Sequence, residues 1–169
     1  MFNVFAVRKN IRAIYTYAKL AYVVSGIRAC YQFDPRFKQS ISELKDGSEI
    51  ILTMFPAPHC IYAIKTPRGL ECKLSRDGFT KDGAYVAFKS FETARPVIDN
   101  KISFSNAFNQ NRYIIQGDIA IGMHMVKLLD MAQATLTTKR KRRLYLQEKP
   151  YSSEVEFKVK MTAWCKGWR

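Results

Sequence analysis

Residues 106–125, NAFNQNRYIIQGDIAIGMHM, contain the strand, turn and helix on which the predicted fold depends. Bulky side chains occupy alternate positions of residues 112–116, a period of two that is typical of a strand. Gly117 ends that strand, and Asp118 is a good helix N-cap because its carboxylate can accept hydrogen bonds from free backbone N–H groups. Residues 119–135 then carry apolar side chains over much of a helical circumference, which predicts a buried helix.

The sequence before this turn predicts four more strands and several helices. Apolar runs bounded by proline and glycine turns are interpreted as strands at 49–55, 60–65, 69–74 and 85–90. Short helices are expected at 36–46, 91–99 and 103–109. The N-terminal residues 2–31 lack proline and repeat apolar residues at helical spacing, which predicts one long basic helix.

The C-terminal segment, residues 136–169, combines a basic run with an alternating pattern. Residues 139–143 are KRKRR, which fits either a solvated connector or a docking patch for an anionic partner. In residues 154–161 apolar side chains alternate with Glu and Lys, which predicts an extra, half-buried strand. We expect a single domain over residues 1–169.

The composition restricts the class of protein. Lys and Arg number 28 against 14 Asp and Glu, so the formal net charge is +14. Such a charge implies attraction to an anionic partner, which the composition leaves open between phospholipid, nucleic acid and acidic protein. The hydrophobic content of 47%, with eleven Phe and nine Tyr, is too high for a disordered chain.

The N-terminal stretch has the wrong charge distribution for a signal peptide. Arg8, Lys9 and Arg12 interrupt the apolar residues and Lys19 lies among them, whereas a signal peptide carries its positive charge before the apolar run. No uncharged apolar run reaches the roughly eighteen residues that a spanning helix needs. We therefore expect a cytoplasmic protein, with peripheral attachment to an anionic membrane as an alternative.

Candidate reactive residues do not form a recognisable centre in the sequence. His59 and Cys60 are adjacent, and neighbouring side chains on an extended chain point apart, so they do not make a dyad. His124 is interpreted as a helix-face histidine with a local partner, and capping accounts for Asp118. The four cysteines have no CxxC spacing and are expected to be reduced thiols. We expect neither catalysis nor a bound metal or cofactor.

Residues 85–131 combine several motifs in one order. The strand YVAFKS is followed by F-x-x-A-x-x-x-I from Phe91, the pair Ala107-Phe108, and RYIIQGD before an apolar helix centred on Met123. This pattern resembles the sterol carrier protein 2-like lipid-binding domain family, and the resemblance covers a core at about residues 41–135. Its most specific points are Ala107-Phe108 and Gly117.

The resemblance implies an α+β fold, with a mostly antiparallel sheet of about five strands covered by helices. It also implies a hydrophobic cavity between sheet and helices that holds an acyl chain, a sterol or another lipid, with no catalytic residue. Ten residues on the matching strands and helices are the expected cavity lining: Phe88, Phe91, Phe104, Phe108, Tyr113, Ile115, Ile119, Met123, Val126 and Leu129.

Two other functions fit the same sequence. A nucleic-acid binder would use the basic residues, although the aromatic residues lie in apolar patterns and do not interleave with Arg on a strand. An assembly protein with a solid core would use its C-terminal segment to form a homodimer. Non-catalytic binding of a hydrophobic ligand is favoured over both, and nucleic acid is the disfavoured partner.

Overall fold

A computed structural model describes residues 4–54, 59–75, 83–146 and 149–166 of the chain. Side chains are described from Ile14 onward, except those of Tyr145 and Lys166. The helices are α1 (Val4–Phe33), α2 (Pro35–Ser42), α3 (Phe91–Ile98), α4 (Phe104–Asn109), α5 (Ile119–Leu136), α6 (Lys139–Tyr145) and α7 (Ser153–Lys166). The strands are β1 (Glu49–Met54), β2 (Cys60–Thr66), β3 (Gly69–Ser75), β4 (Ala84–Phe88) and β5 (Tyr113–Gln116).

The five strands form one mixed sheet in the order β3-β2-β1-β4-β5. Neighbouring strands are antiparallel except β1 and β4, which run parallel from the pair Ile50–Ala84 to the pair Met54–Phe88. The predicted fold class, an α+β fold with a mostly antiparallel five-stranded sheet, is confirmed.

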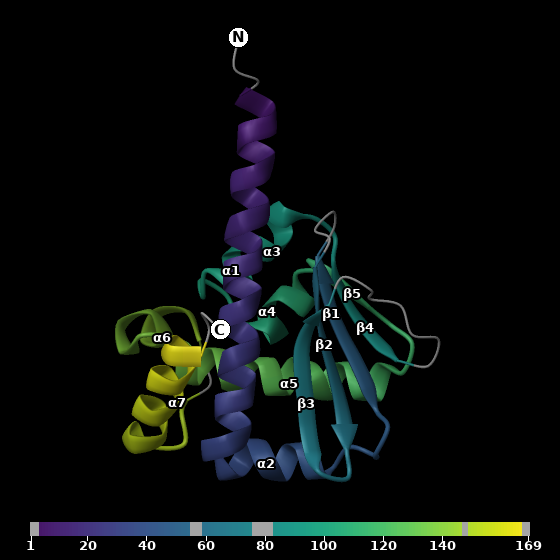
Figure 1. Ribbon diagram of the computed structural model, residues 1–169, viewed down its shortest axis with the longest axis vertical. Coiled ribbons are helices and arrows are strands. Elements are labelled where there is room, and N and C mark those ends of the chain that lie inside the picture. Colours follow the sequence, from purple (N-terminus) through teal and green to yellow (C-terminus); the bar gives the residue numbers. More distant parts are fainter. Residues whose placement is uncertain (1–3, 55–58, 76–82, 147–148, 167–169) are drawn as a thin grey trace.

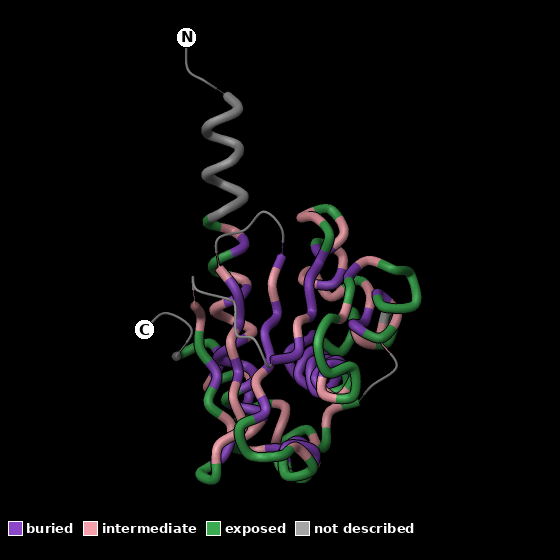
Figure 2. The backbone as a smooth tube through the Cα atoms, turned by 90° about the vertical axis from the view of Figure 1, so that its right-hand side faces the viewer, coloured by how far each residue is buried: buried purple, intermediate pink, exposed green. Residues whose placement is uncertain are grey.

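Helices cover one face of this sheet. Ile50, Leu52 and Met54 alternate along β1 and belong to the buried core that includes α1 and α5. Figure 1 shows α5 crossing behind the strands and α1 standing between the sheet and the pair α6 and α7. In the view of Figure 2, turned by 90°, much of α5 is coloured as buried, because both the sheet and α1 pack on it.

The turn between β5 and α5 has the predicted geometry. The Asp118 carboxylate accepts a hydrogen bond from Ile121 N at 3.1 Å and caps α5. Gly117 has φ +82°, and a Cβ there would lie 2.3 Å from Gly83 O. A larger residue at 117 would therefore collide with the backbone of the neighbouring loop as well as strain its own.

The long N-terminal helix is confirmed as α1, but its buried face is not the one that the sequence pattern suggests. Ile14 is exposed, whereas Leu20, Val24 and Ile27 are buried against the domain. Gly26 allows a close approach to α5, since a Cβ there would lie 2.3 Å from Cδ1 of Leu136. Contacts with α7, β3 and α5 thus decide which side of α1 is buried.

The expectation of a C-terminal strand is wrong: residues 153–166 form α7. Glu154 pairs with Lys158, and Glu156 with Lys160, both at the i,i+4 spacing that stabilises a helix. Ser152 Oγ accepts from Val155 N at 3.2 Å near the start of the helix. The apolar spacing of residues 154–161 fits both a strand and a helix. The spacing of four residues between Glu and Lys indicates the helix.

The four cysteines form no disulfide, and three of them are buried. Burial raises the pKa of Cys30 and of Cys72 to about 12, so both thiols stay protonated near neutral pH. Cys60 is buried beside Ser75 O, while Cys165 is exposed on α7.

The thiol burial predicts unequal reactivity. At pH 8 an aromatic disulfide reagent should titrate Cys165 quickly and the other three thiols only after denaturation, since thiolate is the reactive form. Absorbance of the released thiol measures this. A Cys165→Ser variant should lose the fast phase, and a fast phase of two or more thiols in the native protein would contradict the burial.

Candidate functional site

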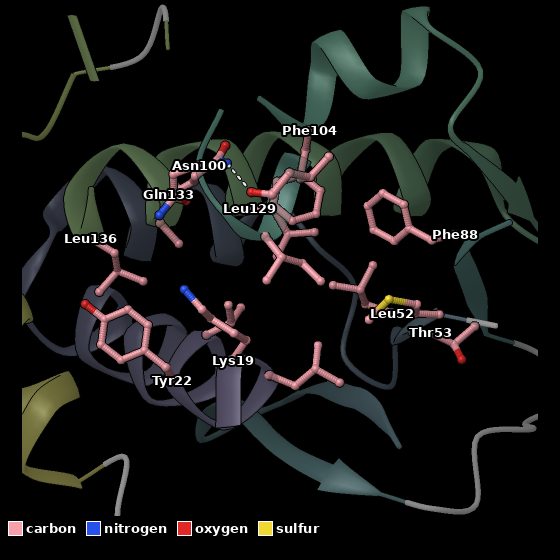
Figure 3. Close-up of a pocket in the computed structure, with 16 residues that line it drawn as sticks. Lys19, Tyr22, Leu52, Thr53, Phe88, Asn100, Phe104, Leu129, Gln133 and Leu136 are labelled. Carbon is pink, nitrogen blue, oxygen red and sulfur yellow. Dashed lines mark hydrogen bonds between the residues drawn. The ribbon is translucent and has the colours of Figure 1, made fainter. Parts of the chain in front are cut away.

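An enclosed pocket lies between α1, the sheet and α5. Its cavity volume is about 60 Å³. Residues of α1, the sheet, α5, α3 and α4 form the apolar wall (Figure 3). Its apolar lining residues are Leu20, Val23, Leu52, Met54, Phe88, Val97, Ile98, Phe104, Leu129, Ala132 and Leu136.

Polar groups gather at one end of the pocket. Figure 3 shows Asn100, Gln133 and Tyr22 on one side, with Lys19 beside them, whereas Phe88 and Leu52 lie on the other. Burial raises the pKa of the Tyr22 phenol, which therefore remains a hydrogen-bond donor at neutral pH. The pocket is amphipathic: apolar along its length and hydrogen-bonding at one end.

Gln133 presents an acceptor without a donor. Its Nε2 donates to Val97 O at 2.9 Å and to Ile102 O at 3.0 Å, so the amide orientation is fixed by two carbonyl groups. Its side chain is buried and its Oε1 has no hydrogen-bond partner. An unsatisfied buried acceptor costs about 1–3 kcal/mol, so a water molecule or a ligand donor bound there would stabilise the protein.

Asp130, one helical turn before Gln133, holds the start of α4. Its carboxylate accepts from Phe104 N at 2.6 Å, from Ser105 N at 3.1 Å and from Ser105 Oγ. Tyr113 from β5 donates its hydroxyl to Phe104 O at 2.9 Å. Burial, and secondarily the charge of Asp130, raises the pKa of Tyr113, so the phenol stays a donor. Phe104 is thereby fixed in the pocket wall.

Lys19 lies at the edge of the polar end in a small charge network. Its Nζ is 3.9 Å from Asp99 Oδ1, and Arg95 Nε is 3.6 Å from Asp99 Oδ2. Tyr15 donates its hydroxyl to Asp99 as well, and burial followed by this hydrogen bond raises the pKa of Tyr15 to about 12. Lys19 is half-exposed, so its ammonium can reach a polar group at the end of the pocket.

A second, smaller void lies deeper under the sheet. It has a volume of about 10 Å³ and is lined by Ile27, Phe37, Ile50 and Met125 among other apolar residues. Leu129 lines both voids. A change of its rotamer would therefore bring the two spaces together.

The ten residues expected to line a cavity are distributed over several environments. Phe88, Phe104 and Leu129 line the larger pocket. Tyr113 and Val126 are buried in the core, and Phe91 and Ile115 pack partly buried against it. The other three, Phe108, Ile119 and Met123, are among the exposed large apolar residues, at 38%, 66% and 41% exposure.

The sequence did not indicate that residues of α1 and β1 line the pocket, nor which residues form its polar end. Leu52, Lys19 and Gln133 lie far apart in the sequence, and only the packing of α1 on α5 brings them together. One signal was present: Asp130 and Gln133 are polar residues three apart in the otherwise apolar stretch of residues 128–134. Such residues are buried only when they have partners, so they indicate a tertiary contact.

His124 has a hydrogen-bond partner on α2. His124 Nε2 donates to Ser40 O at 2.6 Å, which ties α5 to the end of α2. Among the residues that the structure describes, no group of three or more His, Cys, Asp or Glu side chains could hold a metal ion. No helix within the described ranges combines the length and apolar character needed to cross a bilayer.

The sequence matches no protein-family model and no curated protein. Among solved structures, the chain is similar to one described as "UbiJ-SCP2 Ubiquinone synthesis protein", with 14% sequence identity and a TM-score of 0.47. The similarity covers 67% of this chain and 95% of that one. It concerns the arrangement of helices and strands alone, so the function is inferred from the pocket of this chain.

Removing the Asp130 carboxylate should destabilise the fold strongly. Asp130→Ala leaves buried N–H donors at the start of α4 without a partner, at a cost of about 3 kcal/mol in the free energy of unfolding. Asp118→Ala is the matched control, because it removes an exposed N-cap and should cost about 1 kcal/mol. Urea denaturation measures both, and equal losses would contradict the role of Asp130.

Proposed function

We propose that the protein binds a lipid or other hydrophobic ligand, without catalysis, in the pocket between α1, the sheet and α5. The observation that carries the proposal is the pocket itself, whose walls are mostly apolar and whose polar groups, apart from Thr53, lie at one end (Figure 3). Sites for apolar ligands have this character, with a few placed polar groups that orient the ligand. The resemblance of residues 85–131 to a lipid-binding family points the same way.

The ligand has an apolar body and a polar end that donates a hydrogen bond. The free Oε1 of Gln133 can accept that hydrogen bond, while Lys19 and Asn100 offer donors beside it. The apolar body then contacts Leu52, Phe88 and the other core side chains. A wholly apolar ligand would leave the buried acceptor unsatisfied, which disfavours it.

Binding a long ligand requires the pocket to widen. A water molecule needs a cavity of roughly 10–15 Å³. The volume of 60 Å³ therefore holds a few small groups but not an acyl chain or a sterol. Two movements enlarge it: an outward shift of α1 from α5, and a rotamer change of Leu129 that joins the deeper void. We therefore infer that the pocket widens when such a ligand binds.

Several features support a binding role over a catalytic one. Within the described part of the chain, the titratable groups lining the pocket are Lys19 and Tyr22. A nucleophile needs a base within hydrogen-bond reach, and neither group has one among its contacts in the pocket. Lys19 faces Asp99, whose carboxylate is already engaged by Tyr15 and Arg95.

Filling the pocket should abolish binding. Val23→Trp adds an indole to the pocket wall, and the affinity for a fluorescent long-chain fatty acid should fall at least tenfold because the space is occupied. Ile121→Trp is the matched control, since Ile121 is also partly buried but does not line the pocket. Fluorescence titration measures affinity, and circular dichroism checks folding.

The opposite pattern would refute the pocket as the site. Unchanged affinity in Val23→Trp, or an equal loss in Ile121→Trp, would place the fatty acid elsewhere. Native mass spectrometry of the gently purified protein provides an independent measurement, because a bound lipid appears as a discrete mass increment. Displacement by unlabelled sterols, phospholipids and fatty acids then ranks the ligand classes.

A further inference from the structure

The outer face of α7 exposes a row of large apolar side chains. Phe157, Met161 and Trp164 follow one another at spacings of four and three residues, so they lie on one side of the helix. They are 66%, 49% and 67% exposed, respectively. The opposite side of α7 buries Val159 and Ala163 completely. α7 is therefore held by one side and leaves an aromatic stripe on the other.

A basic helix lies beside this stripe. α6 is made of KRKRR followed by Leu144 and Tyr145, and Figure 1 shows α6 and α7 next to each other on the side of α1 opposite the sheet. Arg140, Arg143 and Leu144 are exposed. Neither arginine has an acidic partner among the side chains that the structure describes.

Three contacts hold α6 and α7 to each other and to the end of α5. Arg142 Nη2 is 3.1 Å from Glu156 Oε2, and Lys160 Nζ donates to Thr137 O at 2.9 Å. Arg142 Nη1 also donates to Ala134 O at 2.9 Å and ties α6 to the end of α5. The two carboxylates of α7 described here, Glu154 and Glu156, are each paired with a cation. These contacts hold α6 and α7 in a fixed relative position, and the net charge of the two helices is positive.

We propose that α6 and α7 form a docking surface for an anionic phospholipid bilayer. The α6–α7 surface consists of Arg140, Arg143 and Leu144 of α6 and Phe157, Met161 and Trp164 of α7. The aromatic stripe enters the boundary between headgroups and acyl chains, and the arginines bind phosphate groups above it. An apolar face bordered by cations is typical of helices that lie in this interface.

Charge favours a bilayer over a second copy of the chain. Pairing two α7 stripes would bring two basic α6 helices and two proteins of net charge +14 together, which is repulsive. An anionic bilayer offers apolar depth for the stripe and the opposite charge for α6. Met161 in the centre of the stripe also suits a fluid apolar phase better than stacking on nucleotide bases.

The docking surface adjoins the polar end of the pocket. Lys141 of α6 donates to Asp99 O at 3.4 Å, and the carboxylate of Asp99 faces Lys19. A bilayer held by α6 and α7 would thus lie near the place where a ligand's polar end emerges. The surface is nevertheless independent of the pocket, and bilayer docking does not require ligand binding.

Vesicle binding tests the surface directly. The full chain should bind vesicles of phosphatidylcholine with 30% phosphatidylserine, and at least tenfold more weakly those of phosphatidylcholine alone. Phe157→Ala/Trp164→Ala and, separately, Arg140→Glu/Arg143→Glu should each lower the partition coefficient at least tenfold. In the single-tryptophan variant Trp168→Phe, the emission of Trp164 should shift to the blue on binding.

Matched variants control for general charge and hydrophobicity. Lys38→Glu/Lys127→Glu changes the net charge equally on the exposed surface of α2 and α5, and Ile119→Ala removes an equally exposed apolar side chain; both should bind almost as the natural sequence does. Salt at 0.5 M screens the charge of the arginines, so vesicle flotation in that salt should show weaker binding for every variant.

Three results would overturn the proposal. The first is an equal loss in the control variants. The second is a dimer, seen by sedimentation, that Phe157→Ala/Trp164→Ala dissociates. The third is RNA binding that exceeds vesicle binding and that Arg140→Glu/Arg143→Glu alone abolishes. Because Val23→Trp blocks the pocket and not this surface, vesicle binding of that variant separates failure of docking from failure of ligand binding.

Discussion

Two polar side chains on a buried helix determine how the segment between α3 and α4 is placed. Asp130 accepts from the backbone of Phe104 and Ser105, and Gln133 donates to the carbonyl groups of Val97 and Ile102. Buried polar groups are costly unless they are paired, so these four residues have little freedom to move apart from α5. Without this connection the wall that closes the pocket would have no fixed position relative to the sheet.

The same hydrogen bonds help to explain why the core contains a cavity. Side chains in a protein interior normally interlock at crystal-like density. Here the polar contacts of α5 hold one wall, and the close approach of Gly26 to Leu136 holds α1 on the other side. Neither constraint depends on filling the space between Leu52, Phe88 and Leu129. A void with mostly apolar walls therefore remains, and Oε1 of Gln133, one of its lining residues, has no hydrogen-bond partner.

The tertiary structure gives the basic run of α6 a defined position. The basic run of α6 is too short to be stable as an isolated helix, and it depends on Arg142, which bonds to α5 and to Glu156 of α7. That contact leaves the neighbouring arginines facing outward beside the aromatic stripe. The composition indicates only an attraction to an anionic partner. The tertiary structure places part of the positive charge beside an apolar surface.

The sequence alone determined the elements between residues 34 and 136, because they have local signals: apolar runs in the strands, helical spacing of apolar residues, the Asp118 cap and the Gly117 turn. It also determined the α+β class. The sequence did not decide the state of residues 153–166, since their apolar spacing fits both a strand and a helix until the Glu–Lys pairs are weighed.

Only the tertiary structure decided which apolar residues line the pocket and which are exposed. Ile119 and Met123 lie on the apolar helix yet face solvent, whereas Leu52 and Lys19 reach the pocket from elements distant in sequence. The physical reason is that periodicity defines a face of a helix or strand, while burial depends on which neighbour packs against that face. α5 packs against α1, α4, α7 and the sheet, and none of these contacts is encoded in one segment by itself.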